Sequence, residues 1–107
     1  MLTFVETRLF SRIVGDYLSD EELGRLQAAL AADPERGDFV PGSGGVRKLR
    51  WGMAGRGKRG GVRVIYYLRR REGVIWMLTI YAKNETANLS PAILRRIREE
   101  IDDDREA

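Results

Sequence analysis

Two apolar runs in the second half of the chain constrain its fold most. Residues 62–68 (VRVIYYL) and 74–83 (VIWMLTIYAK) are rich in the β-branched and aromatic side chains that are typical of strands. Only the short segment RRREG separates them, so we expect the two strands to pair as a hairpin. The apolar surface of such a hairpin must be covered by other elements, and helices are the expected cover.

Two further segments predict strands, and one predicts a loop. Residues 2–6 (LTFVE) indicate a short first strand, and residues 46–51 (VRKLRW) alternate between apolar and charged side chains, as a strand does. Residues 37–45 (GDFVPGSGG) are rich in Gly, Pro and Ser, which favours a loop.

The segments between the strands predict helices. Apolar residues recur at helical spacing over residues 9–17, and Gly15 and Asp16 are expected to break the helix. A second helix should begin at Ser19, because Ser19 and Glu22 have the spacing of a capping box, and it should end before Pro34.

A third helix is expected near the C-terminus. Ser90 and Pro91 combine an N-cap with a proline in the first helical position, and the apolar residues after them have helical spacing. Residues 102–107 are expected to be a frayed tail. The predicted order is β-α-α-β-β-β-α, which indicates one α+β domain over residues 1–107, with helices packed on a mostly antiparallel twisted sheet.

Composition excludes several classes of protein and site. The chain has no Cys and no His, so disulfides, thiolate metal sites and histidine general bases are ruled out. No run of apolar residues is long enough to cross a membrane, and the N-terminus does not resemble a secretion signal. We therefore expect a cytoplasmic protein with no metal, no cofactor and no membrane association.

Positive charge is concentrated in the middle of the chain. Residues 42–71 contain ten Lys and Arg and no acidic residue. Residues 1–41 contain four basic and eight acidic residues, and residues 72–107 contain five and eight. This distribution favours a polyanionic partner, with nucleic acid as the first candidate.

The glycine-rich segment GMAGRGKRGG, residues 52–61, resembles nucleotide-binding loops but lacks their context. A P-loop needs Ser or Thr after its lysine, and here Arg59 follows Lys58. Both the P-loop and the dinucleotide-binding loop must open a helix, whereas a strand is predicted next. Together with Arg56 and Arg63, these cations instead favour contact with the phosphates of RNA or DNA.

The runs GGVRKLRWGMAGRGKRGGVRVIYYL (44–68) and LTIYAKNE (78–85) closely resemble the HigB-like branch of the RelE/ParE toxin superfamily. The resemblance covers nearly the whole chain, and the predicted element order matches the RelE-type fold. It implies a type II toxin that enters the ribosomal A site and cuts mRNA without a metal. Its partner would be a HigA-like helix-turn-helix antitoxin, which would bind the basic patch or the helical face, and the complex would contact operator DNA through the antitoxin.

Metal-free RNA cleavage needs a base, a stabiliser of phosphate charge and an acid. Lys58 is the candidate base, because the neighbouring Arg56 and Arg59 should lower its pKa. Arg63 is the candidate phosphate ligand, because guanidinium can make a two-pronged contact with phosphate, and the family places an arginine at the matching strand position.

The segment TIYAKNE is expected to supply the rest of the site. Met77, Thr79, Tyr81 and Lys83 should share one face of their strand. Tyr81 could stack on a base or donate a proton, and Lys83 could bind phosphate or act as the acid. The family often has an arginine acid where this chain has Asn84, so Lys83, Tyr81 and Arg59 remain alternative acids.

Several other residues are candidates for binding RNA or the ribosome. Base stacking is assigned to Tyr81 or Tyr67, because Ser90 and Pro91 occupy the region where related toxins have a stacking tyrosine. Arg47 should face away from Lys48 and Arg50, so one of these two sides should bind phosphate. The full set of candidate binding residues is Arg47, Lys48, Arg50, Arg56, Arg59, Tyr67 and Asn84.

Two other functions are compatible with the same fold. A ParE-like toxin would inhibit DNA gyrase by binding and would need no nuclease chemistry. A non-catalytic RNA-binding module would explain the basic patch and the absence of the usual arginine at Asn84. The convergence of Lys58, Arg63 and Lys83 favours the nuclease over the gyrase inhibitor.

Overall fold

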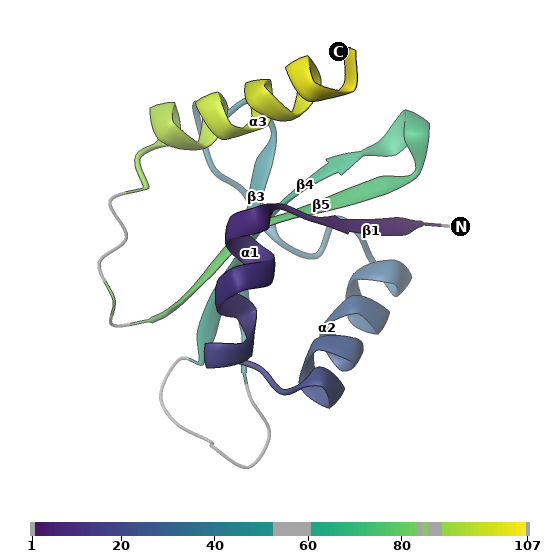
Figure 1. Ribbon diagram of the computed structural model, residues 1–107, viewed down its shortest axis with the longest axis vertical. Helices are drawn as coiled ribbons and strands as arrows, with labels where there is room; N and C mark the ends of the chain where they lie inside the picture. The colour runs from purple at the N-terminus through teal and green to yellow at the C-terminus, as the bar shows by residue number, and fades with distance from the viewer. Residues whose placement is uncertain (1, 53–60, 84, 86–88, 107) are drawn as a thin grey trace.

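The computed structural model describes residues 2–52, 61–83, 85 and 89–106, with the backbone alone for residues 102–106 (Figure 1). Lys58, Arg56, Arg59 and Asn84 lie outside the described residues. In chain order the elements are β1 (Thr3–Glu6), α1 (Arg8–Ile13), the 3-10 helix η1 (Val14–Asp16), α2 (Asp20–Ala32), β2 (Asp38–Phe39), β3 (Val46–Trp51), β4 (Val62–Arg69), the 3-10 helix η2 (Arg70–Glu72), β5 (Val74–Ala82) and α3 (Pro91–Glu106).

Within the described part of the chain, five strands form one sheet in the order β1-β5-β4-β3-β2. The expected hairpin is confirmed: β4 and β5 pair antiparallel from Val62 opposite Ala82 to Arg69 opposite Val74. The turn between them contains η2 and Gly73, whose φ of 67° is easily adopted by glycine. The other antiparallel pairs are β3–β4 and β2–β3, while β1 lies parallel to β5. The α+β fold with a mostly antiparallel sheet is therefore confirmed.

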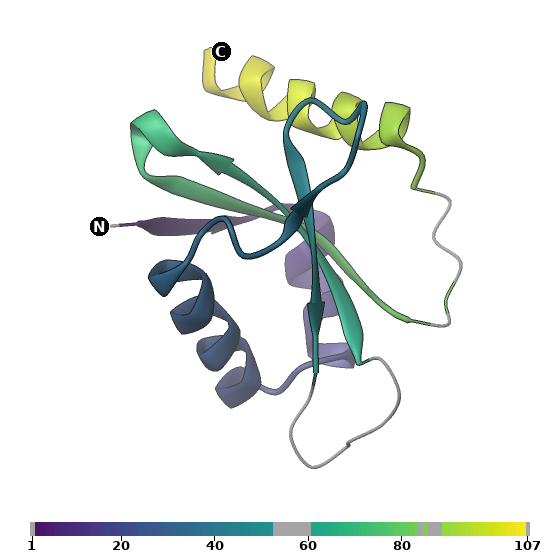
Figure 2. The same cartoon turned by 180° about the vertical axis from the view of Figure 1, so that it is seen from behind.

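The sheet separates two apolar clusters. On one face, Phe10 of α1 and Leu26 of α2 pack with Val64 of β4. On the other face, Leu94 of α3 packs with Ile65 of β4. Figures 1 and 2 show α3 on the opposite side of the sheet from α1 and α2. Alternate residues of β4 thus point to different helices, and this alternation decides on which face each charged residue lies.

The helix boundaries follow from local chemistry. The Ser19 hydroxyl accepts a hydrogen bond from the Glu22 amide at 3.1 Å, and the Glu22 carboxylate accepts one from the Ser19 amide at 2.8 Å. This confirms the capping box, and α2 ends before Asp33 as expected. Gly15 lies in η1, so the predicted break in the first helix is also confirmed.

A β-bulge in β5 changes which of its residues share a face. Consecutive residues of β4 pair with Thr79 and with Met77, which leaves Leu78 as the extra residue. Thr79 and Tyr81 therefore lie on the α3 face, whereas Met77 belongs to the cluster under α1 and α2. The expectation that Met77 shares a face with Tyr81 was wrong, because it assumed an uninterrupted two-residue alternation.

The last helix begins as predicted. The Ser90 hydroxyl accepts a hydrogen bond from the Ile93 amide at 3.2 Å, and Pro91 is the first helical residue. The backbone of α3 is helical as far as Glu106, through most of the segment 102–107, whose fraying stays a prediction. Within the described residues, no helix is long and apolar enough to cross a membrane.

Candidate functional site

Three of the predicted site residues lie in one row across the sheet. Arg50 of β3 pairs with Arg63 of β4, and Arg63 pairs with Tyr81 of β5. Arg63 is two residues from Ile65, which packs under α3, so all three side chains belong to the α3 face. Paired residues on one face are close neighbours, so β-sheet register brings two guanidinium groups and a phenol together.

A groove on this face is lined by three cations of the predicted site, Lys48, Arg50 and Arg63. Its volume is about 450 Å³. One wall is the segment formed by β2 and the residues after it, and the cations come from β3 and β4. The lining residues are Asp38, Phe39, Val40, Pro41, Lys48, Arg50 and Arg63. Lys48 and Arg50 are exposed and Arg63 is half-buried, so solvent reaches the groove on its cationic side.

Tyr81 is the last member of this row and is half-buried against the α3 cluster. Burial raises the pKa of Tyr81 above 10.0, and the positive charge of Arg63 partly opposes that rise. The hydroxyl is therefore neutral near pH 7. It can donate a hydrogen bond to phosphate, but its raised pKa makes it a weaker acid.

Lys83 lies just beyond the end of β5, with its side chain exposed. Its backbone amide donates to the Gly61 carbonyl at 3.3 Å, which joins the end of β5 to the residue before β4. Gly61 has φ of +52°, and a Cβ there would lie 2.2 Å from the Trp51 carbonyl oxygen. The ends of three strands thus meet where the described chain adjoins residues 53–60, the segment that contains Lys58.

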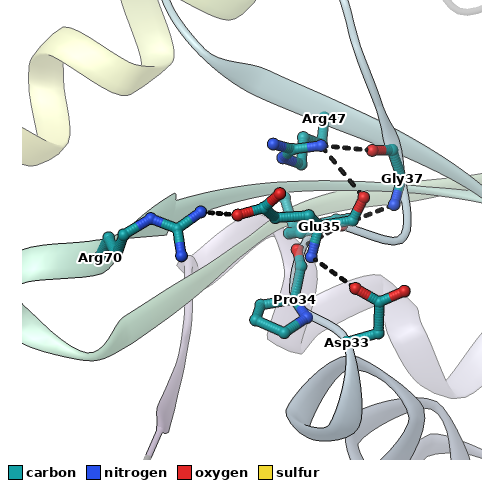
Figure 3. Close-up of polar contacts among 7 residues, drawn as sticks. Asp33, Pro34, Glu35, Gly37, Arg47 and Arg70 are labelled. Carbon is teal, nitrogen blue, oxygen red and sulfur yellow. Dashed lines mark hydrogen bonds and ion pairs between the residues drawn. The ribbon is translucent and has the colours of Figure 1, made fainter.

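Arg47 belongs to a different environment. It is 9% exposed and lies on the opposite face of β3 from Lys48 and Arg50. Its Nη1 donates to the carbonyl oxygens of Gly37 at 2.7 Å and Glu35 at 3.2 Å (Figure 3). This buried arginine holds the chain that leads into β2, so we no longer assign it to RNA binding.

Tyr67 is also distant from the row of Arg50, Arg63 and Tyr81. It lies four residues along β4 from Arg63, or about 13 Å at the usual strand rise. Its ring packs in the α3 cluster, and the guanidinium carbon of Arg98 is 5.5 Å from the ring centre. Among the two tyrosines considered for base stacking, the geometry favours Tyr81.

Two residues near the site were missed by sequence reasoning. Asp38 lies in a segment that was expected to be a loop, and nothing in its local sequence indicates a strand. Glu85 ends the segment LTIYAKNE (78–85), but its partner Tyr17 is 68 residues away in the sequence. One Glu85 carboxylate oxygen accepts hydrogen bonds at 2.7 Å from both the Tyr17 hydroxyl and the Ala82 amide.

The Tyr17–Glu85 contact ties η1 to the end of β5. The hydrogen bond to Glu85 is the main cause that raises the pKa of Tyr17 to about 12. The Ala82 amide and the Tyr17 hydroxyl lower the pKa of Glu85 below 4.5. Near pH 7 the Tyr17 hydroxyl is therefore protonated and the Glu85 carboxyl is ionised, so the hydrogen bond between them forms. This bond and the one to the Ala82 amide hold the end of β5 next to Lys83.

Comparison with known families agrees with this architecture. The sequence model described as the RelE toxin of the RelE / RelB toxin-antitoxin system matches residues 3–102. The match includes all five strands and the groove with Lys48, Arg50 and Arg63. Because it covers nearly the whole chain, the protein belongs to the RelE toxin family.

Proposed function

We propose that the protein is a HigB-like, ribosome-dependent mRNA endonuclease that inhibits translation in the cytoplasm. The observation that carries this proposal is the row of Arg50, Arg63 and Tyr81, with Lys48 in the adjoining groove. These cations come from two adjacent strands and converge on one exposed surface. Membership of the RelE family supports the same activity, because RelE toxins are generally endoribonucleases.

The proposed reaction is an internal transfer at phosphorus. The ribose 2′-oxygen attacks the adjacent phosphorus, a new 2′-O–P bond forms, and the P–O5′ bond breaks. A base takes the proton of the 2′-hydroxyl, and an acid gives a proton to the leaving 5′-oxygen. The products are a 2′,3′-cyclic phosphate and a free 5′-hydroxyl, so the step needs no oxidant, reductant or cofactor.

Arg63 has the central role in this proposal. Its guanidinium would contact two non-bridging oxygens and stabilise the charge that grows on them in the transition state. Removal of one such donor commonly slows catalysis by about 100- to 1000-fold. Lys48 and Arg50 would bind neighbouring phosphates and set the register of the RNA.

The two proton-transfer roles are assigned by chemistry. Lys58 remains the proposed base. For the acid we favour Lys83, because its side chain is exposed just beyond the end of β5, whereas Tyr81 is half-buried. Tyr81 would instead stack on a base or donate a hydrogen bond to phosphate, and Arg56, Arg59 and Asn84 stay proposed RNA contacts.

A HigA-like helix-turn-helix antitoxin is the proposed cellular partner. The complex would reach operator DNA through the antitoxin. Masking of the groove cations by acidic antitoxin residues would explain inhibition, and steric exclusion from the ribosome would do so equally well.

The proposal is tested by inducing the protein alone and mapping mRNA 5′ ends in translating cells. We expect new ends that are phased with codons and that disappear when translation is blocked beforehand. Intact mRNA together with a DNA-damage response would instead indicate ParE-like inhibition of gyrase. Intact mRNA with normal growth would indicate a non-catalytic RNA-binding module.

A further inference from the structure

One carboxylate lies in the cationic groove. Asp38 of β2 pairs with Lys48 of β3, so their side chains occupy the same face, and Asp38 lines the groove with Arg50 and Arg63. Its side chain is exposed. Within the described residues it forms no salt bridge, although three cations line the same groove. A group that repels phosphate thus occupies a surface that is otherwise suited to phosphate.

The backbone that carries Asp38 is held in place from beneath. The fully buried Tyr66 hydroxyl donates to the Pro34 carbonyl at 2.9 Å and accepts from the Gly37 amide at 2.8 Å. Arg47 donates to the Gly37 carbonyl at 2.7 Å (Figure 3). Both polar groups of the residue before Asp38 are therefore fixed by buried side chains. Such support lets a binding residue keep its geometry before its ligand arrives.

The size of the groove fits one nucleotide. Small-molecule sites usually measure about 300–1,000 Å³, and this groove measures about 450 Å³. Lys48 and Arg50 can bind the phosphate of that nucleotide, while Val40 and Pro41 provide apolar surface for its base. The ionised Asp38 carboxylate beside the base can only accept hydrogen bonds, so it favours a base with adjacent N–H donors on one edge.

Among the four RNA bases, guanine matches that requirement best. Its N1–H and N2–H groups lie side by side and can donate to both oxygens of one carboxylate, as the two prongs of an arginine do. Adenine and cytosine present an amino donor beside a ring-nitrogen acceptor, which a carboxylate repels. Uracil presents one donor between two carbonyl oxygens, so it is disfavoured as well.

We infer that this groove binds one nucleotide of RNA and that Asp38 selects guanine at that position. The inference rests on the proposed function for its choice of RNA as the ligand. It adds a determinant of base preference, which lies on the edge strand rather than among the residues proposed to act on the scissile phosphate.

The test measures binding of the four ribonucleoside 3′-monophosphates to the full chain by NMR titration. The variants are Asp38→Asn, which keeps the shape of the side chain, and the control Glu21→Gln, which removes one negative charge from the exposed surface of α2. We expect wild type and the control to bind the guanosine nucleotide roughly 10-fold more tightly than the others. A thermal melt equal to that of wild type verifies the fold of each variant.

Asp38→Asn should move the affinities in opposite directions. The affinity for the guanosine nucleotide should fall about 10-fold, because the side-chain amide of Asn has one oxygen and cannot accept from both the N1–H and the N2–H group with two oxygens, as a carboxylate does. The other three should bind equally well or more tightly, because a charge that repels phosphate is gone. A uniform change for all four nucleotides, or no guanine preference in wild type, would overturn the inference.

Cleavage mapping separates this inference from the proposed function. Guanine enrichment at one position beside the cut sites, present in wild type and in Glu21→Gln and lost in Asp38→Asn, supports the inference. Cleavage by wild type without guanine enrichment overturns it and leaves the proposed function standing. Guanine-selective binding that depends on Asp38, without any cleavage, supports the inference while the proposed nuclease function fails.

Discussion

The substitution Tyr66→Phe tests how the groove wall is held, because it removes one oxygen atom from a fully buried side chain. The Tyr66 hydroxyl accepts a hydrogen bond from the Gly37 amide and donates one to the Pro34 carbonyl. A buried donor left without an acceptor costs about 1–3 kcal/mol, so we expect a loss of about 2 kcal/mol in the free energy of unfolding. For a chain of this length, that corresponds to a melting temperature lower by roughly 8 °C.

The assay is urea unfolding of Tyr66→Phe beside the matched control Tyr67→Phe. Tyr67 is the next residue on β4, and its ring is only half-buried, so the control should stay within about 0.5 kcal/mol of wild type. Hydrogen exchange should also show faster exchange of the Gly37 amide in Tyr66→Phe alone. Equal stability of the two variants, with unchanged exchange at Gly37, would refute our account of how β2 is anchored.

Two further predictions concern the ends of the strands. Gly61→Ala should destabilise the protein by more than about 2 kcal/mol in urea unfolding, because the new Cβ would collide with the Trp51 carbonyl at a residue with positive φ. The control Gly24→Ala lies in an uncrowded part of α2 and should stabilise the protein by up to about 1 kcal/mol. A Gly61→Ala variant more stable than Gly24→Ala would contradict this prediction. The hydrogen bond to Glu85 raises the pKa of Tyr17 from 10.0 to about 12, so folding holds this proton more tightly, and the associated stability is complete below pH 10 and lost as the pH rises to about 12. Tyr17→Phe should therefore lose less stability than wild type between these pH values, and parallel curves would contradict the assignment.

Much of the fold could be predicted because its signals are local. The β4–β5 hairpin follows from two strand-forming runs that are close in sequence. The start of α2 follows from Ser19 and Glu22, whose side chains each bond to the backbone of the other residue. Arg63 could be assigned to a strand and given a candidate role because a motif surrounds it, and the face on which it lies follows from strand alternation.

The rest depends on contacts between distant residues. β1 pairs with β5, which lies more than 70 residues later in the chain, so no local pattern indicates this pairing. β2 is only two residues long, which is too short for a strand pattern in the sequence. The bulge at Leu78 interrupts an alternation that looks regular in sequence. Arg47 resembles its exposed neighbours by residue type, and its burial depends on the Glu35 and Gly37 carbonyl groups and on the Phe39 ring, which no local pattern indicates.

The most direct test of the central claim is the rate at which purified protein cuts an mRNA held in the A site of a translating ribosome. The comparison is between wild type, Arg63→Ala and the control Arg25→Ala, whose side chain is 52% exposed on α2. We predict that Arg63→Ala slows cleavage by at least about 100-fold while the protein stays folded, and that Arg25→Ala cuts as wild type does. Cleavage by Arg63→Ala within threefold (roughly 0.7 kcal/mol) of the wild-type rate would contradict the proposed site, and an equal rate on free mRNA would contradict ribosome dependence.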